Sequence, residues 1–127
     1  ANGEKMEFTL KCENMNPFRG LIYEWKVTNG TDEIIGVYVG KASNGISRPL
    51  KDYKRNVAKI IAKKLYRKSN PDGFRKVHLA LHTAVVNKHS IELTILENVT
   101  EGQCINSLEQ QYISKAREKH GKFCLNG

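Results

Sequence analysis

The sequence has few cysteines and no long apolar run. Cys12, Cys104 and Cys124 are odd in number, far apart and outside any CxxC spacing, so neither a disulfide framework nor a zinc knuckle is expected. Residues 1–16 mix both charge signs without an apolar core, and no segment approaches the ~18 apolar residues of a membrane span. We therefore expect a cytoplasmic protein with no membrane partner.

Acidic residues are scarce beside basic ones. The 127 residues include 21 Lys and Arg and 13 Asp and Glu, which gives a net charge of +8 and a pI near 9.5. This excess favours polyanionic partners, either nucleic acid or an anionic lipid surface, and carries no information about the fold. An apolar content of 39% in a chain of this length predicts one domain with one core.

Two segments early in the chain predict a β-hairpin. Residues 21–27 and 34–39 are rich in β-branched and aromatic side chains, and the Asn29-Gly30 pair between them is a turn signal. The second segment is apolar on both alternations, which is typical of a central strand. Ahead of the hairpin, residues 1–19 are expected to form an N-terminal extension with one short alternating stretch, at 6–10.

The rest of the chain predicts three helices and one more strand. Apolar residues at helical spacing predict a helix from Ser47, with Pro49 in its first turn, to about Lys68, where SNPDG interrupts the pattern. The later elements are a helix over 74–87, a strand over 91–95 and a helix from 103 or 105 to 119. The order β-β-α-α-β-α predicts an α+β domain over residues 20–127, in which helices flank a small three-stranded antiparallel sheet.

Tyr23 and Tyr38 lie on the two strands of the predicted hairpin. A two-residue turn would place Tyr23 opposite Gly36, and a longer symmetric loop would place it opposite Tyr38. Because side chains alternate along a strand, both registers put the two phenols on the same side of the sheet. Packing, with the hydroxyls at the rim, is one role for such a pair, and a polar site is the other.

Several motifs in their order resemble the GIY-YIG nuclease family. Gly20-Leu21-Ile22-Tyr23 followed by Tyr38-Val39-Gly40 resembles the family signature with Leu21 inserted, and YVGKASN is especially similar to the excision-repair members. Arg48 lies ten residues after Tyr38, where the family has an arginine that contacts phosphate. The segment SLEQQYISKA resembles the one that carries the family's metal-binding glutamate, here Glu109, and Asn126 matches an asparagine near the domain's end.

The sequence departs from the family pattern one helical turn after the arginine. Members commonly carry His or Tyr four residues on, where this chain has Asp52, and Tyr53 follows at an offset of five. One residue corresponds to about 100° around a helix, so Tyr53 takes that role only if Pro49 reshapes the first turn. Arg55 is the alternative guanidinium if Arg48 proves to be misplaced.

The resemblance implies a metal-dependent endonuclease that hydrolyses DNA phosphodiester bonds. Glu109 would hold one Mg²⁺ or Mn²⁺, since hard carboxylate oxygen suits these ions, and Arg48 would meet the phosphoryl oxygens. Tyr23 would orient or deprotonate the attacking water, and Tyr38 would position the phosphate or the water. A phenol with a pKa of about 10 is a poor base at neutral pH, so cations such as Lys41 or Arg48, together with the metal, are expected to favour the phenolate.

The first predicted helix carries a row of basic residues at every fourth position: Lys51, Arg55, Lys59, Lys63 and Arg67. Like charges at this spacing destabilise a helix by ~0.2–0.5 kcal/mol per pair, so a nucleic-acid backbone is the favoured explanation. The substrate-binding candidates are then Lys41, Tyr53, Arg55, Lys59, Lys63 and Asn126. Cleavage of RNA, an inert nucleic-acid-binding domain and, on weaker grounds, a membrane-surface protein are the alternatives, and a homodimer is an open option.

Overall fold

The computed structural model describes residues 8–12, 14–63, 66, 69 and 73–126. In this part of the chain, a four-stranded mixed sheet and three helices form an α+β fold. The elements are β1 (Phe8–Lys11), β2 (Leu21–Thr28), β3 (Ile34–Ala42), α1 (Ser47–Ile61), α2 (Lys76–Val86), β4 (Ser90–Asn98), α3 (Ile105–His120) and the 3₁₀ turn η1 (Gly121–Phe123). The predicted class is confirmed, whereas the expected three-stranded antiparallel sheet is wrong in strand number and direction.

The additional strand, β1, lies in the segment expected to be an extension. The strand order is β1-β4-β2-β3, and β1 runs parallel to β4 with Phe8 opposite Ile91. The Phe8 ring meets Trp25 edge to face with 5.1 Å between centroids, so β1 adds apolar burial to the sheet. Met6, at the start of the predicted alternating stretch, lies outside the described residues.

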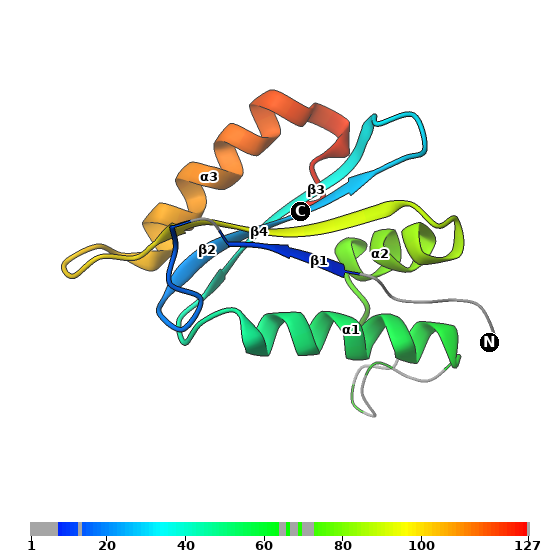
Figure 1. Ribbon diagram of the computed structural model, residues 1–127, viewed down its shortest axis with the longest axis horizontal. Coiled ribbons are helices and arrows are strands. Elements are labelled where there is room, and N and C mark those ends of the chain that lie inside the picture. Colours follow the sequence, from blue (N-terminus) through cyan, green and yellow to red (C-terminus); the bar gives the residue numbers. More distant parts are fainter. Residues whose placement is uncertain (1–7, 13, 64–65, 67–68, 70–72, 127) are drawn as a thin grey trace.

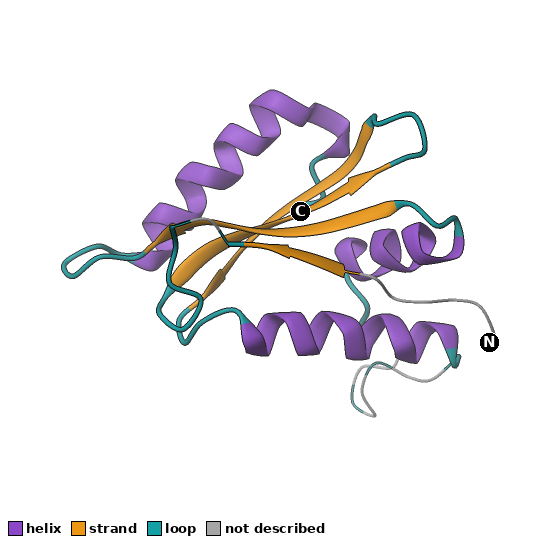
Figure 2. Ribbon diagram, in the orientation of Figure 1, coloured by secondary structure: helices purple, strands orange, loops and turns teal. Residues whose placement is uncertain are grey.

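Helices cover both faces of the sheet (Figures 1 and 2). On one face, α1 and α2 pack on a core that includes Leu21, Trp25 and Leu93. On the other face, α3 packs on Ile22 and Val37. This two-sided cover explains the continuous apolar pattern of β2 and β3, because both alternating sets of side chains are buried.

The loop of the β2–β3 hairpin is wider than either predicted register. Tyr23 pairs with Gly40 and Trp25 pairs with Tyr38, with an irregularity at Val27 and Thr28. The side-chain oxygen of Asn29 accepts hydrogen bonds from the backbone amides of Thr31 and Glu33, at 2.9 and 3.0 Å. This asparagine-centred loop replaces the expected tight turn, but Tyr23 and Tyr38 still lie on the same face, as predicted.

The expectation that residues 34–39 form a central strand is wrong, because β3 is at the edge of the sheet. The chain end covers that edge: Val37 forms a bridge with Cys124, and the Leu125 amide donates to the Val37 carbonyl at 2.7 Å. Backbone pairing of this kind satisfies an edge that would otherwise expose its polar groups.

The first helix begins at Ser47 as predicted but ends at Ile61 rather than near Lys68. The amide of Lys63 bonds to the carbonyl of Ile60, and Lys63 has a φ of 57°, which are features of a helix end. The predicted end at Lys68 and the basic residue Arg67 lie outside the described residues. Within the described ranges, no helix combines the length and apolar character needed to cross a bilayer.

Candidate active site

A pocket of about 560 Å³ brings together side chains from both faces of the sheet. Most of the predicted site residues line it: Tyr23, Tyr38, Lys41, Arg48, Tyr53, Arg55, Lys59 and Glu109. Although α3 packs on the face opposite to α1, β3 is the edge strand, so Glu109 reaches the pocket past that edge. The carboxylate and the two hairpin phenols therefore face a common space.

Gly40 makes room for the Tyr23 ring. The two residues are cross-strand partners, and a Cβ atom at position 40 would lie 2.3 Å from both Cζ and the hydroxyl oxygen of Tyr23. Carbon atoms in normal contact are about 3.5–4.0 Å apart, so no larger residue fits there while Tyr23 keeps its place. The glycine that follows Tyr38 and Val39 is thus explained by packing against the other tyrosine.

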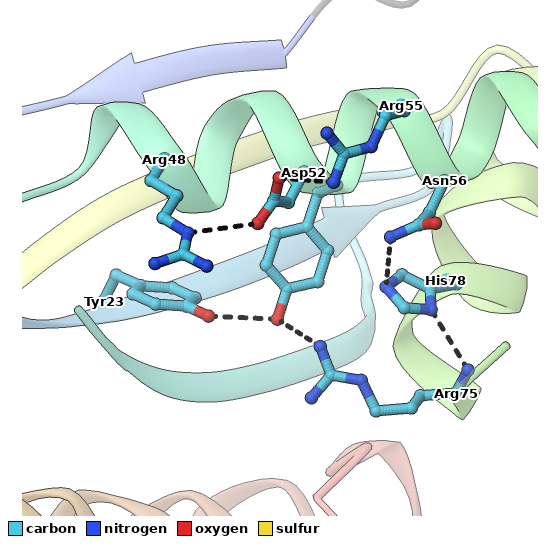
Figure 3. A network of polar contacts seen from close by, with 8 residues as sticks. Tyr23, Arg48, Asp52, Arg55, Asn56, Arg75 and His78 are labelled. Carbon is cyan, nitrogen blue, oxygen red and sulfur yellow. Dashed lines mark hydrogen bonds and ion pairs between the residues drawn. The ribbon is translucent and has the colours of Figure 1, made fainter. Parts of the chain in front are cut away.

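The phenols belong to a hydrogen-bond network that includes Arg75, a residue the sequence reasoning missed. The hydroxyls of Tyr23 and Tyr53 are 3.0 Å apart, and the Arg75 guanidinium donates to Tyr53 at 3.3 Å and to Tyr38 at 2.9 Å. The guanidinium carbon of Arg75, Cζ, also lies over the Tyr38 and Tyr53 rings, 5.6 and 5.8 Å from their centroids. Figure 3 shows Arg75 extending toward Tyr23 from the start of α2.

Burial keeps the phenols of Tyr23 and Tyr53 protonated. It raises the pKa of Tyr23 to about 12, although the bond from Tyr53 and the charge of Arg75 act in the opposite direction. Arg75, rather than the expected Lys41 or Arg48, is the cation that lowers the pKa of Tyr23, and desolvation outweighs it. The expected effect of a bound metal ion on this phenol stays a prediction. Burial also raises the pKa of Tyr53, and the bond with Tyr23 raises it further.

His78 holds Arg75 in place. The backbone amide of Arg75 donates to Nδ1 of His78 at 3.1 Å, and the imidazole Nε2 lies 3.5 Å from the Asn56 side chain on α1. Burial, with a smaller contribution from Arg75, lowers the pKa of His78 to about 4, so the ring is neutral. The contact between Arg75 and His78 is local, since His78 is the third residue of α2 and accepts from the residue that caps the helix. The packing of α1 against α2 is what brings Asn56 to them.

Arg48 and Arg55 share one carboxylate at the rim of the pocket. Arg48 lies 3.8 Å from Asp52 with its side chain 84% exposed, and Arg55 lies 2.7 Å from the same residue. Asp52 therefore occupies the outer side of α1, while Tyr53 lies on the buried stripe of that helix with Asn56. Tyr53, which follows Arg48 by five residues, thus lines the pocket beside Tyr23.

Glu109 is the carboxylate that could hold a metal ion. Burial raises its pKa, and the neighbouring charge of Lys41, whose ammonium donates to Asn106 on α3, lowers it. Among the described residues there is no group of three or more His, Cys, Asp and Glu side chains that suits a metal. A single carboxylate such as Glu109 does not supply the three or four protein ligands typical of zinc. It does fit Mg²⁺, which is commonly held by one or two carboxylates plus water and phosphate oxygens.

Two of the predicted substrate-binding residues lie elsewhere. Lys63 follows the end of α1 and is not among the residues that line the pocket. Asn126 accepts a hydrogen bond from the Val39 amide at 2.9 Å and donates to the Val39 carbonyl at 2.8 Å, so its side chain pairs with the edge of β3. Lys59 does line the pocket, and its ammonium donates to the carbonyl of Tyr66 at 3.0 Å.

Comparison of the chain with protein-family models, curated proteins and solved structures found no match. The pocket presents phenols, guanidinium and ammonium groups and the carboxylates of Asp52 and Glu109, a set that suits a phosphate ester and a hard cation.

Proposed function

We propose that the protein is a divalent-metal-dependent endonuclease that hydrolyses DNA phosphodiester bonds, the activity implied by its resemblance to the GIY-YIG family. One observation carries the proposal. Phenols from β2 and β3 and the Glu109 carboxylate from the opposite side of the sheet line a single pocket with five Lys and Arg side chains. The three cysteines are free, which suits the proposed cytoplasmic location.

The proposed role of Tyr23 follows from the protonation of its hydroxyl. Tyr23 keeps its hydroxyl proton at neutral pH, so it orients the attacking water by hydrogen bonding rather than acting as the base. Tyr38 positions the phosphate through its own hydroxyl. Arg48, at the rim, donates to the phosphoryl oxygens, and its loose pairing with Asp52 at 3.8 Å leaves it free to turn toward a substrate.

Glu109 would hold one Mg²⁺ or Mn²⁺. When bound, such an ion supplies Lewis-acid stabilisation of the phosphoryl charge. The charge of Lys41 acts on Glu109, and its ammonium donates a hydrogen bond to Asn106 on α3. Lys41 therefore contributes positive charge on the same side of the pocket as Glu109.

The basic side of α1 would dock the nucleic-acid backbone. Arg55 and Lys59 line the pocket, whereas Lys51 is exposed on the same helix and does not. Phosphate contacts of this kind position a duplex without reading its sequence. RNA offers the same backbone charge, so structured RNA is included as a second substrate in the test.

The proposal is tested with the purified chain, supercoiled plasmid and Mg²⁺ or Mn²⁺. Glu109→Gln should abolish metal-stimulated nicking and leave binding of a short duplex at low salt unchanged or slightly tighter, because a negative charge leaves a basic pocket. Glu118→Gln is the matched control: Glu118 is exposed on α3 and does not line the pocket. This control should nick and bind like the unmodified chain.

Three results would count against the proposal in different ways. Cleavage by Glu109→Gln at the unmodified rate would remove the carboxylate from the mechanism. Binding of DNA without nicking in either metal would favour an inert nucleic-acid-binding domain. Cleavage confined to structured RNA would keep the chemistry but replace the substrate.

A further inference from the structure

We propose that Arg75 binds a non-bridging phosphate oxygen of the nucleic acid in this pocket, as a second guanidinium that no sequence motif indicates. This inference rests on the proposed function and adds a substrate-contacting residue to it. Arg75 lines the pocket and lies 2.9 Å from the hydroxyl of Tyr38 and 3.3 Å from that of Tyr53. Both Arg75 and Arg48 are exposed residues, but Arg75 is hydrogen-bonded to the phenols, whereas Arg48 pairs with Asp52.

The charge of Arg75 is available to a ligand. Asp52 pairs with the other two pocket guanidiniums, those of Arg48 and Arg55. In the described part of the chain, no carboxylate lies within ion-pair distance of Arg75, and its side-chain hydrogen bonds go to phenol oxygens. A guanidinium has five N–H donors, so two phenol contacts leave donors for a phosphate.

The surroundings keep Arg75 both charged and fixed. Partial burial opposes its charge, but the phenols of Tyr53, Tyr38 and Tyr23 together raise the pKa of Arg75. Its backbone amide is tied to His78, and its guanidinium lies over two aromatic rings. A donor held in this way meets developing charge with little rearrangement, which is the condition under which such donors contribute most.

The hydrogen bond from Arg75 to Tyr38 leaves the Tyr38 hydroxyl as a second donor for the phosphate. A guanidinium can only donate, so the Tyr38 oxygen accepts from Arg75 and the Tyr38 hydroxyl proton remains for another acceptor. Arg75 and Tyr38 can then donate together to one phosphate group. Neutral ligands would gain little from this pair, whereas a phosphodiester offers two non-bridging acceptor oxygens that share one negative charge.

The test compares Arg75→Gln with Lys76→Gln in the full chain. Lys76 is the adjacent residue, is exposed and does not line the pocket, so its substitution removes the same charge from the same end of α2. Circular dichroism and thermal melting first establish that each variant is folded. Fluorescence anisotropy with a short DNA duplex, without metal and over a range of salt, measures binding, and cleavage in Mg²⁺ gives kcat and KM.

Arg75→Gln should lower kcat about 100-fold, as loss of a donor to a charged transition state does. It should also reduce the slope of log affinity against log salt by about 0.9, the value for one phosphate contact. Lys76→Gln should stay within about twofold in kcat. Arg75→Lys keeps the charge without the planar fork, so it should recover salt-dependent binding but little of kcat, and it serves in place of Arg75→Gln if that variant does not fold.

The outcomes separate this inference from the proposed function. If the unmodified chain cleaves and Arg75→Gln behaves like Lys76→Gln in kcat and in salt slope, Arg75 makes no phosphate contact and the inference is overturned. If the unmodified chain binds DNA but never cleaves, the nuclease proposal fails, and the binding slopes alone decide the role of Arg75. A chain that binds no nucleic acid overturns both.

Discussion

Replacing Gly40 with alanine tests the packing that places Tyr23 in the pocket. The new Cβ would lie 2.3 Å from the Tyr23 Cζ and hydroxyl oxygen, so the ring must move by more than about 1 Å to reach normal contact. Tyr23 is 5% exposed and bonded to Tyr53 at 3.0 Å, so such a shift disturbs both the core and the network. Overpacking costs about 1–3 kcal/mol and a lost hydrogen bond about 0.5–1.5, which together predict a destabilisation of roughly 2–4 kcal/mol.

Gly36→Ala is the matched control on the same strand. Its Cβ would lie 3.4 Å from Leu125 and 3.6 Å from Val27, close to ordinary contact, so we expect no loss of stability and a gain of up to about 1 kcal/mol. Urea denaturation followed by the fluorescence of Trp25, the single tryptophan, measures both variants. Gly40→Ala should also lose nicking activity. Equal unfolding midpoints for the two variants, with activity retained, would refute the argument that Gly40 exists to accommodate Tyr23.

Two further substitutions probe the network. Tyr53→Phe removes a hydrogen bond that lowers the pKa of Tyr23, so Tyr23 should ionise at a higher pH than its present value of about 12. Spectrophotometric titration of tyrosinate, with Tyr23→Phe as the reference, checks this, and an unchanged titration would mean that the bond with Tyr53 does not lower the pKa of Tyr23. The pKa of His78 is about 4 in the folded chain against ~6.5 unfolded, so the unfolded state takes up the proton first as pH falls, and stability is full above about pH 6.5 and declines toward pH 4. Urea unfolding at pH 7 and pH 5 should show a loss of ~1–2 kcal/mol that is smaller in His78→Gln, whereas identical losses would assign the pH dependence to other groups.

Local pattern was enough to predict the helices, the hairpin and the shared face of its two tyrosines. Apolar spacing along α1 and the runs of β-branched and aromatic residues along β2 and β3 are properties of neighbouring residues, so they can be read from the sequence. Loop chemistry was harder to predict. Asn29 could begin a tight turn or accept several backbone amides, and the observed bonds to Thr31 and Glu33 select the wider loop.

These local patterns do not predict pairing between strands that are far apart in the sequence. β1 pairs with β4 across some eighty residues, and the burial of Phe8 against Trp25, rather than any feature of residues 8–11 alone, makes that pairing favourable. Likewise Asn126 reads as a family motif residue in the sequence, whereas its side chain is occupied by the Val39 backbone in the structure.

The sequence by itself indicated Tyr23, Tyr38, Arg48 and Glu109 as candidates for one site, because each lies in a segment that resembles a family motif. Only the tertiary structure decided which groups meet. Arg75 reaches Tyr38 and Tyr53 because α2 packs beside α1 and His78 ties its backbone, and Glu109 reaches the same space because β3 is an edge strand. Distances between elements depend on how side chains fill the core, and the local periodicity of the sequence does not indicate that packing.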